Sequence, residues 1–282
     1  MRWFVAGANG MLGQDLCRVL EEAGHEVTGR DLPELDILSP AMCEEQVAGH
    51  DVVVNVAAYT AVDNAETDEA KAFAINAIGA ANLARAATKA GASMVQISTD
   101  YVFDGDASTP YAADAPVDPQ SAYGRTKAAG EWAVRAECPQ SWIVRTAWLY
   151  GANGPSFPKT MAKLGAERDE LGVVTDQVGQ PTWTVDLAEG IVRIVEAGAP
   201  FGIWHGTSSG RASKFDQAKA LFEDLGIEVS LNEITSDAFP TPAKRPAYSV
   251  LAHDMWDDAG IDPLPDWRAA QQRSLREMFP DH

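Results

Sequence analysis

The chain opens with Arg2-Trp3-Phe4-Val5-Ala6, an apolar run that leads directly into Gly7-Ala8-Asn9-Gly10-Met11-Leu12-Gly13. The run has the length of a buried strand, and a helical pattern follows from about residue 11 to residue 23. Glycine permits a tight turn and lets the backbone approach a neighbouring group closely. The stretch 2–23 therefore predicts a strand, a glycine turn and a helix, which is how a doubly wound α/β fold begins.

The same alternation continues along the first two-thirds of the chain. Strand-like runs occur at 26–30, 51–56, 93–98 and 141–146, and helical patterns fall near 40–48, 68–90 and 120–136. Parallel strands need crossover connections, which are usually helices that cover both faces of the sheet. The pattern predicts the α/β class, with a Rossmann-type doubly wound parallel sheet.

The rhythm changes after Tyr150. A loop at 151–155 precedes a helix near 157–168 and a short strand at 173–174, and then a helix near 184–197 leads to a strand at 201–205 that we expect to rejoin the main sheet. Residues 210–282 carry two further helices around a proline-rich loop at 239–246. We expect a Rossmann domain of 1–150 plus about 171–209, and a smaller C-terminal substrate-binding lobe of 151–170 plus about 210–282.

Charge and composition exclude several classes of partner. The chain has 22 Lys and Arg against 41 Asp and Glu, a formal net charge of −19, which argues against nucleic acid or an anionic membrane as a partner. Adaptation to salt is one hypothesis for this acidity. The longest apolar stretches, such as 52–58, have the length of strands, and no secretory signal pattern opens the chain. A cytoplasmic location is therefore predicted.

Cysteine and histidine give no sign of a disulfide framework or a metal site. Cys17, Cys43 and Cys138 are widely spaced and odd in number, so free thiols are expected. The five histidines show no paired spacing typical of metal ligands. We expect no catalytic metal.

The glycine turn predicts a dinucleotide site. Gly7, Gly10 and Gly13 stand where a strand passes into a helix, so that backbone amides can approach a pyrophosphate at the positive end of the helix. The spacing is GxxGxxG rather than the usual GxGxxG, and the strand–turn–helix context supports the interpretation more than the spacing does.

The end of the second strand is the place where the ribose of the adenosine is recognised. Asp31 can accept a hydrogen bond from a free 2′-hydroxyl, which favours NADH, and Arg30 can pair with a 2′-phosphate, which favours NADPH. The sequence leaves the choice open, with a lean to NADPH. Asp36-Ile37 and Ala58-Tyr59-Thr60 follow in later loops and are expected to line the same crevice.

Tyr123 and Lys127 lie four residues apart, so that on a helix they share one face. Reduction of a ketone needs a proton donor beside the hydride donor, and a phenol with its ordinary pKa of about 10 is a weak acid. We expect the ammonium of Lys127 to lower the pKa of Tyr123 and to hold the nicotinamide ribose. Thr99, at the end of the fourth strand, is expected to hydrogen-bond the same carbonyl oxygen.

Several motifs resemble those of the extended short-chain dehydrogenase/reductases, and within them the dTDP-4-dehydrorhamnose reductase family. They are Ser98-Thr99-Asp100-Tyr101-Val102-Phe103-Asp104-Gly105, Ala57-Ala58-Tyr59-Thr60-Ala61-Val62-Asp63, Arg145-Thr146-Ala147-Trp148-Leu149-Tyr150-Gly151, Asp176-Gln177-Val178-Gly179-Gln180-Pro181-Thr182 and Pro242-Ala243-Lys244-Arg245-Pro246-Ala247-Tyr248-Ser249. The resemblance covers nearly the whole chain.

The resemblance implies reduction, by NADPH or NADH, of the C4 ketone of dTDP-4-dehydro-β-L-rhamnose to give dTDP-β-L-rhamnose for cell-surface polysaccharide. It places Thr99, Asp100 and Trp148 on the deoxysugar, and Arg245 suits the diphosphate. It also implies cofactor contacts at Gly10, Met11, Leu12, Asp36, Ile37, Ala58, Tyr59, Thr60, Ile97 and Ser98.

One motif departs from the family pattern: Ser156-Phe157 stands where such enzymes usually carry Asn-Phe. The resemblance leaves open whether Mg²⁺ binds and whether the protein is a monomer or a homodimer. Two alternatives also stay open. One is a reductase or epimerase of another nucleotide-linked 4-keto sugar, and the other is a non-catalytic regulatory subunit of the same fold.

Overall fold

The structure, a computed structural model, describes residues 1–280 and is built on a six-stranded parallel sheet. The strand order is β10-β5-β4-β3-β1-β2, and each neighbouring pair is parallel. The strands are β1 (Arg2–Ala6), β2 (Glu26–Arg30), β3 (Val52–Asn55), β4 (Ser93–Thr99), β5 (Ser141–Thr146) and β10 (Gly202–His205). This confirms the predicted fold class, including the return of the strand near 201–205 to the main sheet.

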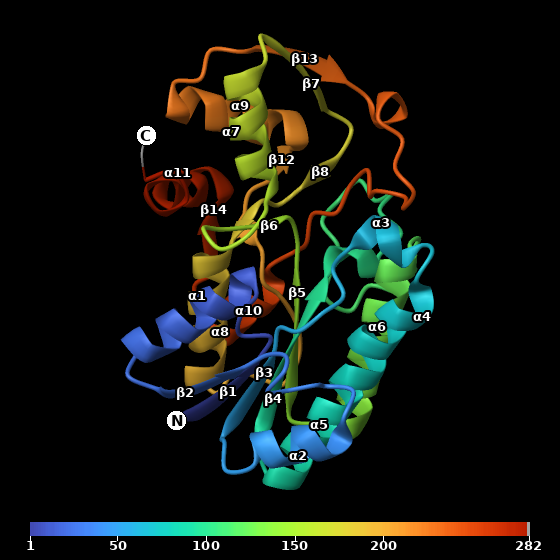
Figure 1. Cartoon of the computed structure of the whole chain (residues 1–282), viewed down its shortest axis with the longest axis vertical. Helices are drawn as coiled ribbons and strands as arrows, with labels where there is room; N and C mark the ends of the chain where they lie inside the picture. The colour runs from blue at the N-terminus through green and yellow to red at the C-terminus, as the bar shows by residue number, and fades with distance from the viewer. Residues whose placement is uncertain (281–282) are drawn as a thin grey trace.

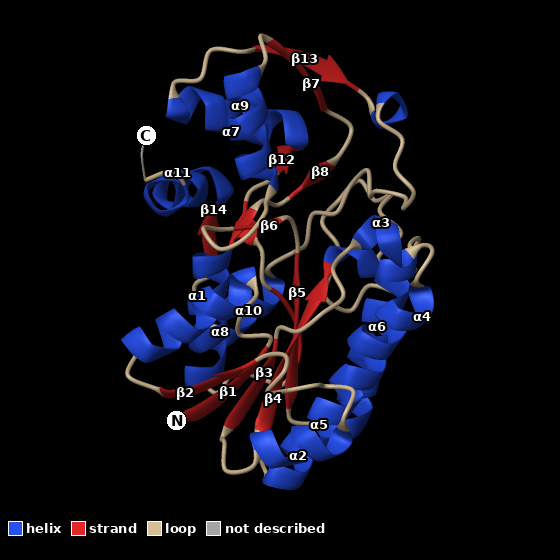
Figure 2. Ribbon diagram, viewed as in Figure 1, coloured by secondary structure: helices blue, strands red, loops and turns tan. Residues whose placement is uncertain are grey.

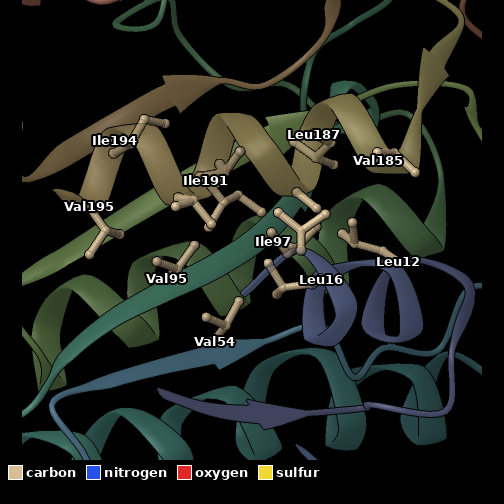
Figure 3. Packing of buried hydrophobic residues seen from close by; sticks show 14 of the residues in the cluster. Leu12, Leu16, Val54, Val95, Ile97, Val185, Leu187, Ile191, Ile194 and Val195 are labelled. Atoms are coloured by element: carbon tan, nitrogen blue, oxygen red, sulfur yellow. The ribbon is translucent and has the colours of Figure 1, made fainter. Parts of the chain in front are cut away.

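Helices cover both faces of this sheet (Figures 1 and 2). On one face lie α1 (Met11–Glu22) and α8 (Thr184–Glu196), which pack in a cluster that includes Leu16, Val54, Val95 and Ile191 (Figure 3). On the other face lie α2 (Pro40–Val47), α5 (Ala80–Ala90) and α6 (Ala122–Glu137). Strands buried on both faces explain why β1 and β3 are almost continuously apolar.

A smaller group of elements packs above the carboxyl ends of the strands (Figure 1). It contains α7 (Phe157–Glu167), α9 (Lys214–Leu225) and the parallel pair β7 (Glu170–Val174) and β13 (Ser230–Ile234), with an apolar cluster of its own around Leu171 and Phe222. Short pairs join it to the rest: β6 (Leu149–Tyr150) with β9 (Thr182–Trp183), β8 (Val178–Gly179) with β12 (Ala212–Ser213), and β11 (Ser208–Ser209) with β14 (Leu264–Asp266).

Two stretches differ from the expected elements. The helix expected at 68–90 consists of α4 (Glu69–Phe73), a π-helical segment η1 (Ala74–Gly79) and α5, and it follows the short α3 (Val62–Ala65). Residues 210–280 contain three helices rather than two, since α10 (Asp254–Ala259) and α11 (Trp267–Met278) follow α9. The remaining 3-10 turns are η2 (Asp100–Val102) and η3 (Ser236–Ala238).

The division into a Rossmann domain and a lobe remains a proposal, and packing refines two of its boundaries. β7 pairs with β13 of the smaller group and not with the main sheet, although 171–209 was expected in the Rossmann domain. Conversely, Trp256 of α10 and Met278 of α11 belong to the large apolar cluster on the face of the main sheet that α1 and α8 cover. Apolar residues of the last helices are therefore shared between the two parts.

The topology predicts where a ligand binds. β1 lies between β2 and β3, so the direction of winding reverses at β1 and β3, and ligands of open α/β sheets bind outside the carboxyl ends of the strands at such a switch point. In the part of the chain that the structure describes, no helix has the length and apolar character that crossing a membrane requires.

Candidate active site

A cavity of about 900 Å³ opens at this switch point. It brings together residues from the ends of β1 to β5 and from the start of α6. The predicted site residues that line it are Gly7, Gly10, Met11, Leu12, Asp31, Asp36, Ile37, Ala58, Thr60, Ile97, Ser98, Thr99, Asp100, Tyr123, Lys127 and Trp148.

The glycine turn has the form of a cradle for a pyrophosphate. Gly7 has a φ of 86°, and a Cβ built on it would lie 2.6 Å from the backbone nitrogen of Ala57. A Cβ on Gly13 would lie 2.2 Å from the carbonyl oxygen of Gly7, so Gly13 acts in packing α1 against the turn and does not line the cavity. Gly10 caps α1 without a side chain, which leaves the first amides of the helix accessible to an anion.

The two candidates at the end of β2 behave differently. The carboxylate of Asp31 lines the cavity and accepts hydrogen bonds from the backbone amides of Asn9, at 3.2 Å, and Leu32, at 2.8 Å. Arg30 does not line the cavity, because its guanidinium donates to Gln46 Oε1 at 3.1 Å and to the carbonyl of Gly29 at 2.9 Å.

Thr99, Asp100 and Tyr123 form the centre of the site. The Thr99 hydroxyl donates to Asp100 Oδ1 at 2.9 Å, and Asp100 Oδ2 is buried without a hydrogen-bond partner. Burial raises the pKa of Asp100 to about 6, against the opposing effects of the Ser249 and Thr99 hydroxyls and the charge of Lys214. The ring of Tyr101 stands edge-on to Tyr123 at 5.6 Å.

The electrostatics of Tyr123 differ from the expectation. Burial raises the pKa of its phenol above the ordinary value, the Thr99 hydroxyl acts in the opposite direction, and the charges of Asp100 and Tyr101 add to the rise. Lys127 is not among the groups that shift this pKa, and its Nζ donates to the carbonyl oxygen of Ile97 at 2.6 Å. The predicted lowering of the Tyr123 pKa by Lys127 is therefore wrong in this structure, because desolvation dominates.

Lys127 is itself almost fully buried. Burial lowers its pKa to about 8, and the charge of Glu131, one helical turn further on, opposes this. Glu131 accepts a hydrogen bond from Ser98 Oγ at 2.5 Å and a bidentate pair from Arg145 at 2.9 and 2.8 Å. This buried network ties α6 to β4 and β5, and so it fixes Tyr123 and Lys127 relative to Thr99.

Trp148 borders the substrate end of the cavity. Its φ is 47°, and among residues 1–280 it is the one residue other than glycine that has a positive φ. Its indole lies against Gly179, where an added Cβ would come within 2.7 Å of the ring. Arg245 does not line the cavity: its Nη2 donates to Asp63 at 2.6 Å, while its Nη1 is buried without a partner. Tyr59 is also absent from the lining, since it packs beside Ala65 and Ala72.

Sequence reasoning missed several residues at the site. Lys71 of α4 and Tyr101 of η2 line the cavity. Asn76 in the π-helical segment accepts from the Tyr59 amide at 2.8 Å and donates to Thr126 Oγ1 at 3.0 Å, which holds the Tyr59 loop against α6. A polar residue in an alanine-rich helix was the available signal for Asn76. The ammonium of Lys214 lies against the face of the Trp148 ring, and no local sequence pattern predicts this contact.

Among residues 1–280, no group of three or more His, Cys, Asp or Glu side chains is arranged to hold a metal ion. Cys17, Cys43 and Cys138 are free thiols, as expected.

A doubly wound sheet, a glycine cradle at its switch point, and a threonine, a tyrosine and a lysine in one cavity define an oxidoreductase of the short-chain dehydrogenase/reductase class. Residues 1–279 match the family model described as the RmlD substrate binding domain, and the chain belongs to that family. The resemblance to the dTDP-4-dehydrorhamnose reductases is thereby confirmed.

Known proteins are similar to this chain over nearly their full lengths. The chain is 47% identical to a "Probable dTDP-4,6-dihydroxy-2-methyloxan-3-one 4-ketoreductase" of Streptomyces antibioticus, covering 100% of this chain and 95% of the relative. It is 46% identical to the dTDP-4-dehydrorhamnose reductase of Streptomyces griseus, covering 99% and 93%. A crystal structure of dTDP-4-dehydrorhamnose reductase from Bacillus anthracis in complex with NADP superposes with a TM-score of 0.94 at 37% identity, covering 98% and 99%.

Proposed function

We propose that the protein reduces the C4 ketone of dTDP-4-dehydro-β-L-rhamnose to dTDP-β-L-rhamnose, with NADPH or NADH as the reductant, in dTDP-rhamnose biosynthesis. Support comes from the family, from full-length relatives named dTDP-4-dehydrorhamnose reductase and from a structural neighbour that contains NADP. The observation that carries the proposal is the meeting of Thr99, Tyr123 and Lys127 with the glycine turn in one cavity.

The residues of the chain fit a dinucleotide. The cradle at Gly7 leaves space that a Cβ would fill, the first amides of α1 stand open above Gly10, and Asp31 stands where an adenosine ribose is recognised. A bound nicotinamide cofactor supplies the hydride that the ketone carbon receives. In this proposal the amide ends of α1 hold the pyrophosphate, and Lys127 holds the nicotinamide ribose.

Tyr123 is the proton donor of the proposed reaction. A donor in a reduction has to be protonated beforehand, and a phenol whose pKa lies above its ordinary value of about 10 is protonated at neutral pH. When the ketone carbon accepts a hydride, negative charge would develop on the C4 oxygen, and Tyr123 would donate its proton to that oxygen. The Thr99 hydroxyl, whose one hydrogen goes to Asp100 Oδ1 in this structure, would have to turn from Asp100 to hydrogen-bond it. Asp100 and Trp148 border the space in which the deoxysugar would lie.

The remaining properties belong to the same proposal. The substrate is a dTDP-linked 4-keto-6-deoxy sugar, the site of action is the cytoplasm, and the protein acts as a monomer or a homodimer without nucleic acid or membrane. Gel filtration with light scattering, with and without Mg²⁺, distinguishes the two oligomeric states and tests a role for the ion.

A second candidate substrate deserves comparison, because the relative from Streptomyces antibioticus is as similar as the one from Streptomyces griseus but is named for a different dTDP-linked 4-ketosugar. The two candidates share the cofactor, the proton donor and the nucleotide. They differ in the hydroxyl groups that the walls of the sugar site would contact.

The test is the coupled oxidation of NADPH, and then of NADH, with dTDP-4-dehydrorhamnose made in situ and the product identified by NMR. The proposal predicts dTDP-β-L-rhamnose and a higher kcat/KM for this ketone than for other dTDP-linked 4-keto sugars. Preference for a different 4-keto sugar would favour the second candidate. Absence of oxidation with every sugar, together with a stoichiometric protein partner, would favour the regulatory subunit.

A further inference from the structure

Lys214 lies in an unusual environment for a lysine. It is the first residue of α9, and its Nζ stands 3.3 Å from the centre of the Trp148 indole and 4.7 Å from the centre of the Phe157 ring. Among residues 1–280, the Lys214 ammonium contacts these two rings and has no hydrogen-bond or salt-bridge partner. Aromatic faces attract a cation, but they replace only part of the hydration that it loses.

The charges around Lys214 belong to the substrate end of the site. Burial lowers the pKa of Lys214 to about 7, the charge of Asp100 opposes this, and Arg245 adds to the lowering. The charged groups that act on Lys214 are therefore one anion, from η2, and one further cation, from the proline-rich loop. The Arg245 cation is already paired with Asp63 on one side, so an anion between Lys214 and Arg245 would interact with both.

Other hydrogen-bond donors near this place also lack partners. Arg245 Nη1 is buried without one, and so is the hydroxyl of Ser156, the residue that precedes Phe157 and caps α7. Buried donors are almost always paired in folded proteins, so these two buried donors, together with the ammonium of Lys214, favour a ligand that accepts hydrogen bonds. Pro155, next to Ser156, lines the cavity.

The substrate of the proposed reaction carries such an acceptor in its diphosphate. In a chain with a net charge of −19, a diphosphate needs cations placed at its own binding site. The lysines that line the cavity, Lys71 and Lys127, come from α4 and α6 on the cofactor side. Lys214 and Arg245 lie outside that lining, and both act on groups at the substrate end, Lys214 on Asp100 and Arg245 on Tyr101.

We propose that Lys214 is a substrate-binding residue whose ammonium contacts the diphosphate of the nucleotide sugar, together with Arg245 and the Ser156 hydroxyl. This inference rests on the proposed function, since it names the part of the substrate that the lobe recognises. It also accounts for Ser156: where the family pattern has an asparagine, a serine offers a shorter reach, and the lysine of the facing helix supplies a second contact. No bond is made or broken in this role.

The test is the affinity of the full chain, with NADP⁺ bound, for dTDP and for thymidine, measured by calorimetry. Loss of a charged hydrogen bond predicts that Lys214→Met weakens dTDP binding by about ten- to a hundredfold. Thymidine binding should stay unchanged, because it lacks phosphate. Lys214→Arg should restore most of the affinity for dTDP. Lys219→Met, at an exposed lysine of the same helix, is the matched control and should bind dTDP as the wild type does.

The outcomes separate this inference from the proposed function. If Lys214→Met binds dTDP as tightly as the wild type, or if it loses thymidine and dTDP to the same extent, Lys214 only supports Trp148 and the inference is wrong. Wild-type protein that does not bind dTDP would overturn it as well. A wild type that binds dTDP through Lys214 but oxidises no cofactor with any 4-keto sugar would contradict the proposed function alone. Should Lys214→Met fail to fold, Lys214→Gln takes its place beside the arginine variant.

Discussion

The cofactor half of the crevice, formed by the turn at 7–13 and the ends of β2 and β3, takes its shape from the backbone. The substrate half, formed around Asp100, Trp148, Ser156, Lys214 and Arg245, takes its shape from side chains of five separate segments. In the cofactor half, close backbone approaches exclude any Cβ at Gly7, and Asp31 is hydrogen-bonded to two amides. In the substrate half, Asp100 Oδ2, Ser156 Oγ and Arg245 Nη1 are buried without partners.

This difference indicates that the backbone forms the cofactor site and that side chains form the substrate site. Backbone geometry at a strand–helix turn is stable in itself, so the site for a dinucleotide is complete when the sheet has formed. Buried polar groups without partners cost free energy in the folded protein, and a ligand that pairs with them recovers that cost. Substitutions in the cofactor half should therefore destabilise the fold. Substitutions of the unpaired polar groups in the substrate half should raise the stability of the protein and lower its affinity for the substrate.

The largest effect is expected at the turn itself. In Gly13→Ala the new Cβ would lie 2.2 Å from the carbonyl oxygen of Gly7, and backbone cannot move away without displacing α1. We expect a loss of more than about 3 kcal/mol in the free energy of unfolding, because an overpacked rigid contact has to distort its surroundings. Urea unfolding measures this loss.

Gly24→Ala is the control for the turn, because Gly24 has a φ of 81° but no atom within 4 Å of a built Cβ. It should cost about 1–2 kcal/mol, the strain of a left-handed residue alone. A loss in Gly13→Ala no larger than that in Gly24→Ala would contradict the claim that the close approach to Gly7 constrains the turn.

The second effect has the opposite sign and lies in the substrate half. The pKa of Asp100 is raised to about 6, so between pH 4 and pH 6 the folded state binds more protons than the unfolded state. The free energy of unfolding therefore decreases as the pH rises from 4 to 6, and the full decrease remains above pH 6. Asp100→Asn should stabilise the protein at pH 8 by about 2–3 kcal/mol and remove this dependence.

Thermal unfolding of Asp100→Asn between pH 4 and pH 8 checks this, and the exposed Asp114→Asn provides the baseline. The same variant should bind and reduce the ketone less well. A destabilised Asp100→Asn at pH 8 would mean that the buried carboxylate contributes to the fold, and the comparison between the two halves would then fail.

The smallest effect concerns the choice of cofactor. Asp31 lines the cavity, so Asp31→Ala should raise the KM for NADH by about tenfold and improve the relative use of NADPH, whose 2′-phosphate the carboxylate would repel. Arg30 is engaged by Gln46 and Gly29, so Arg30→Ala should change the ratio of the two KM values less than threefold, or about 0.6 kcal/mol. A strong loss of NADPH use in Arg30→Ala would show that this side chain turns toward the phosphate.

The same contrast explains what could be predicted from the sequence. Strand lengths, the order of the elements and the cofactor residues follow from local patterns, because Gly7 and Asp31 act through the elements in which they stand. Thr99 was found because strand ends meet at one edge of a parallel sheet, and Tyr123 and Lys127 were found because residues four apart share one face of a helix. The direction of the Tyr123 pKa shift was missed because it depends on burial, which the i, i+4 spacing does not report.

The substrate half escaped prediction for a physical reason. Lys214 lies more than sixty positions from Trp148 in the chain, and the contact depends on how α9 packs against α7 and β12. Arg245 was expected from its proline-rich loop, but its salt bridge with Asp63 and its place outside the cavity lining follow from tertiary packing. Asn76 was missed because a π-helical segment cannot be distinguished from an α-helix by an alanine-rich composition.

The most direct test of the account is the turnover of Tyr123→Phe, measured beside its affinity for NADPH. A phenylalanine keeps the ring among its neighbours but has no proton to give, so NADPH should bind as in the wild type while kcat falls by about a hundred- to ten-thousandfold. Tyr111→Phe, a tyrosine outside the cavity, should retain the wild-type kcat. Undiminished turnover in Tyr123→Phe would contradict the assignment of Tyr123 as the proton donor.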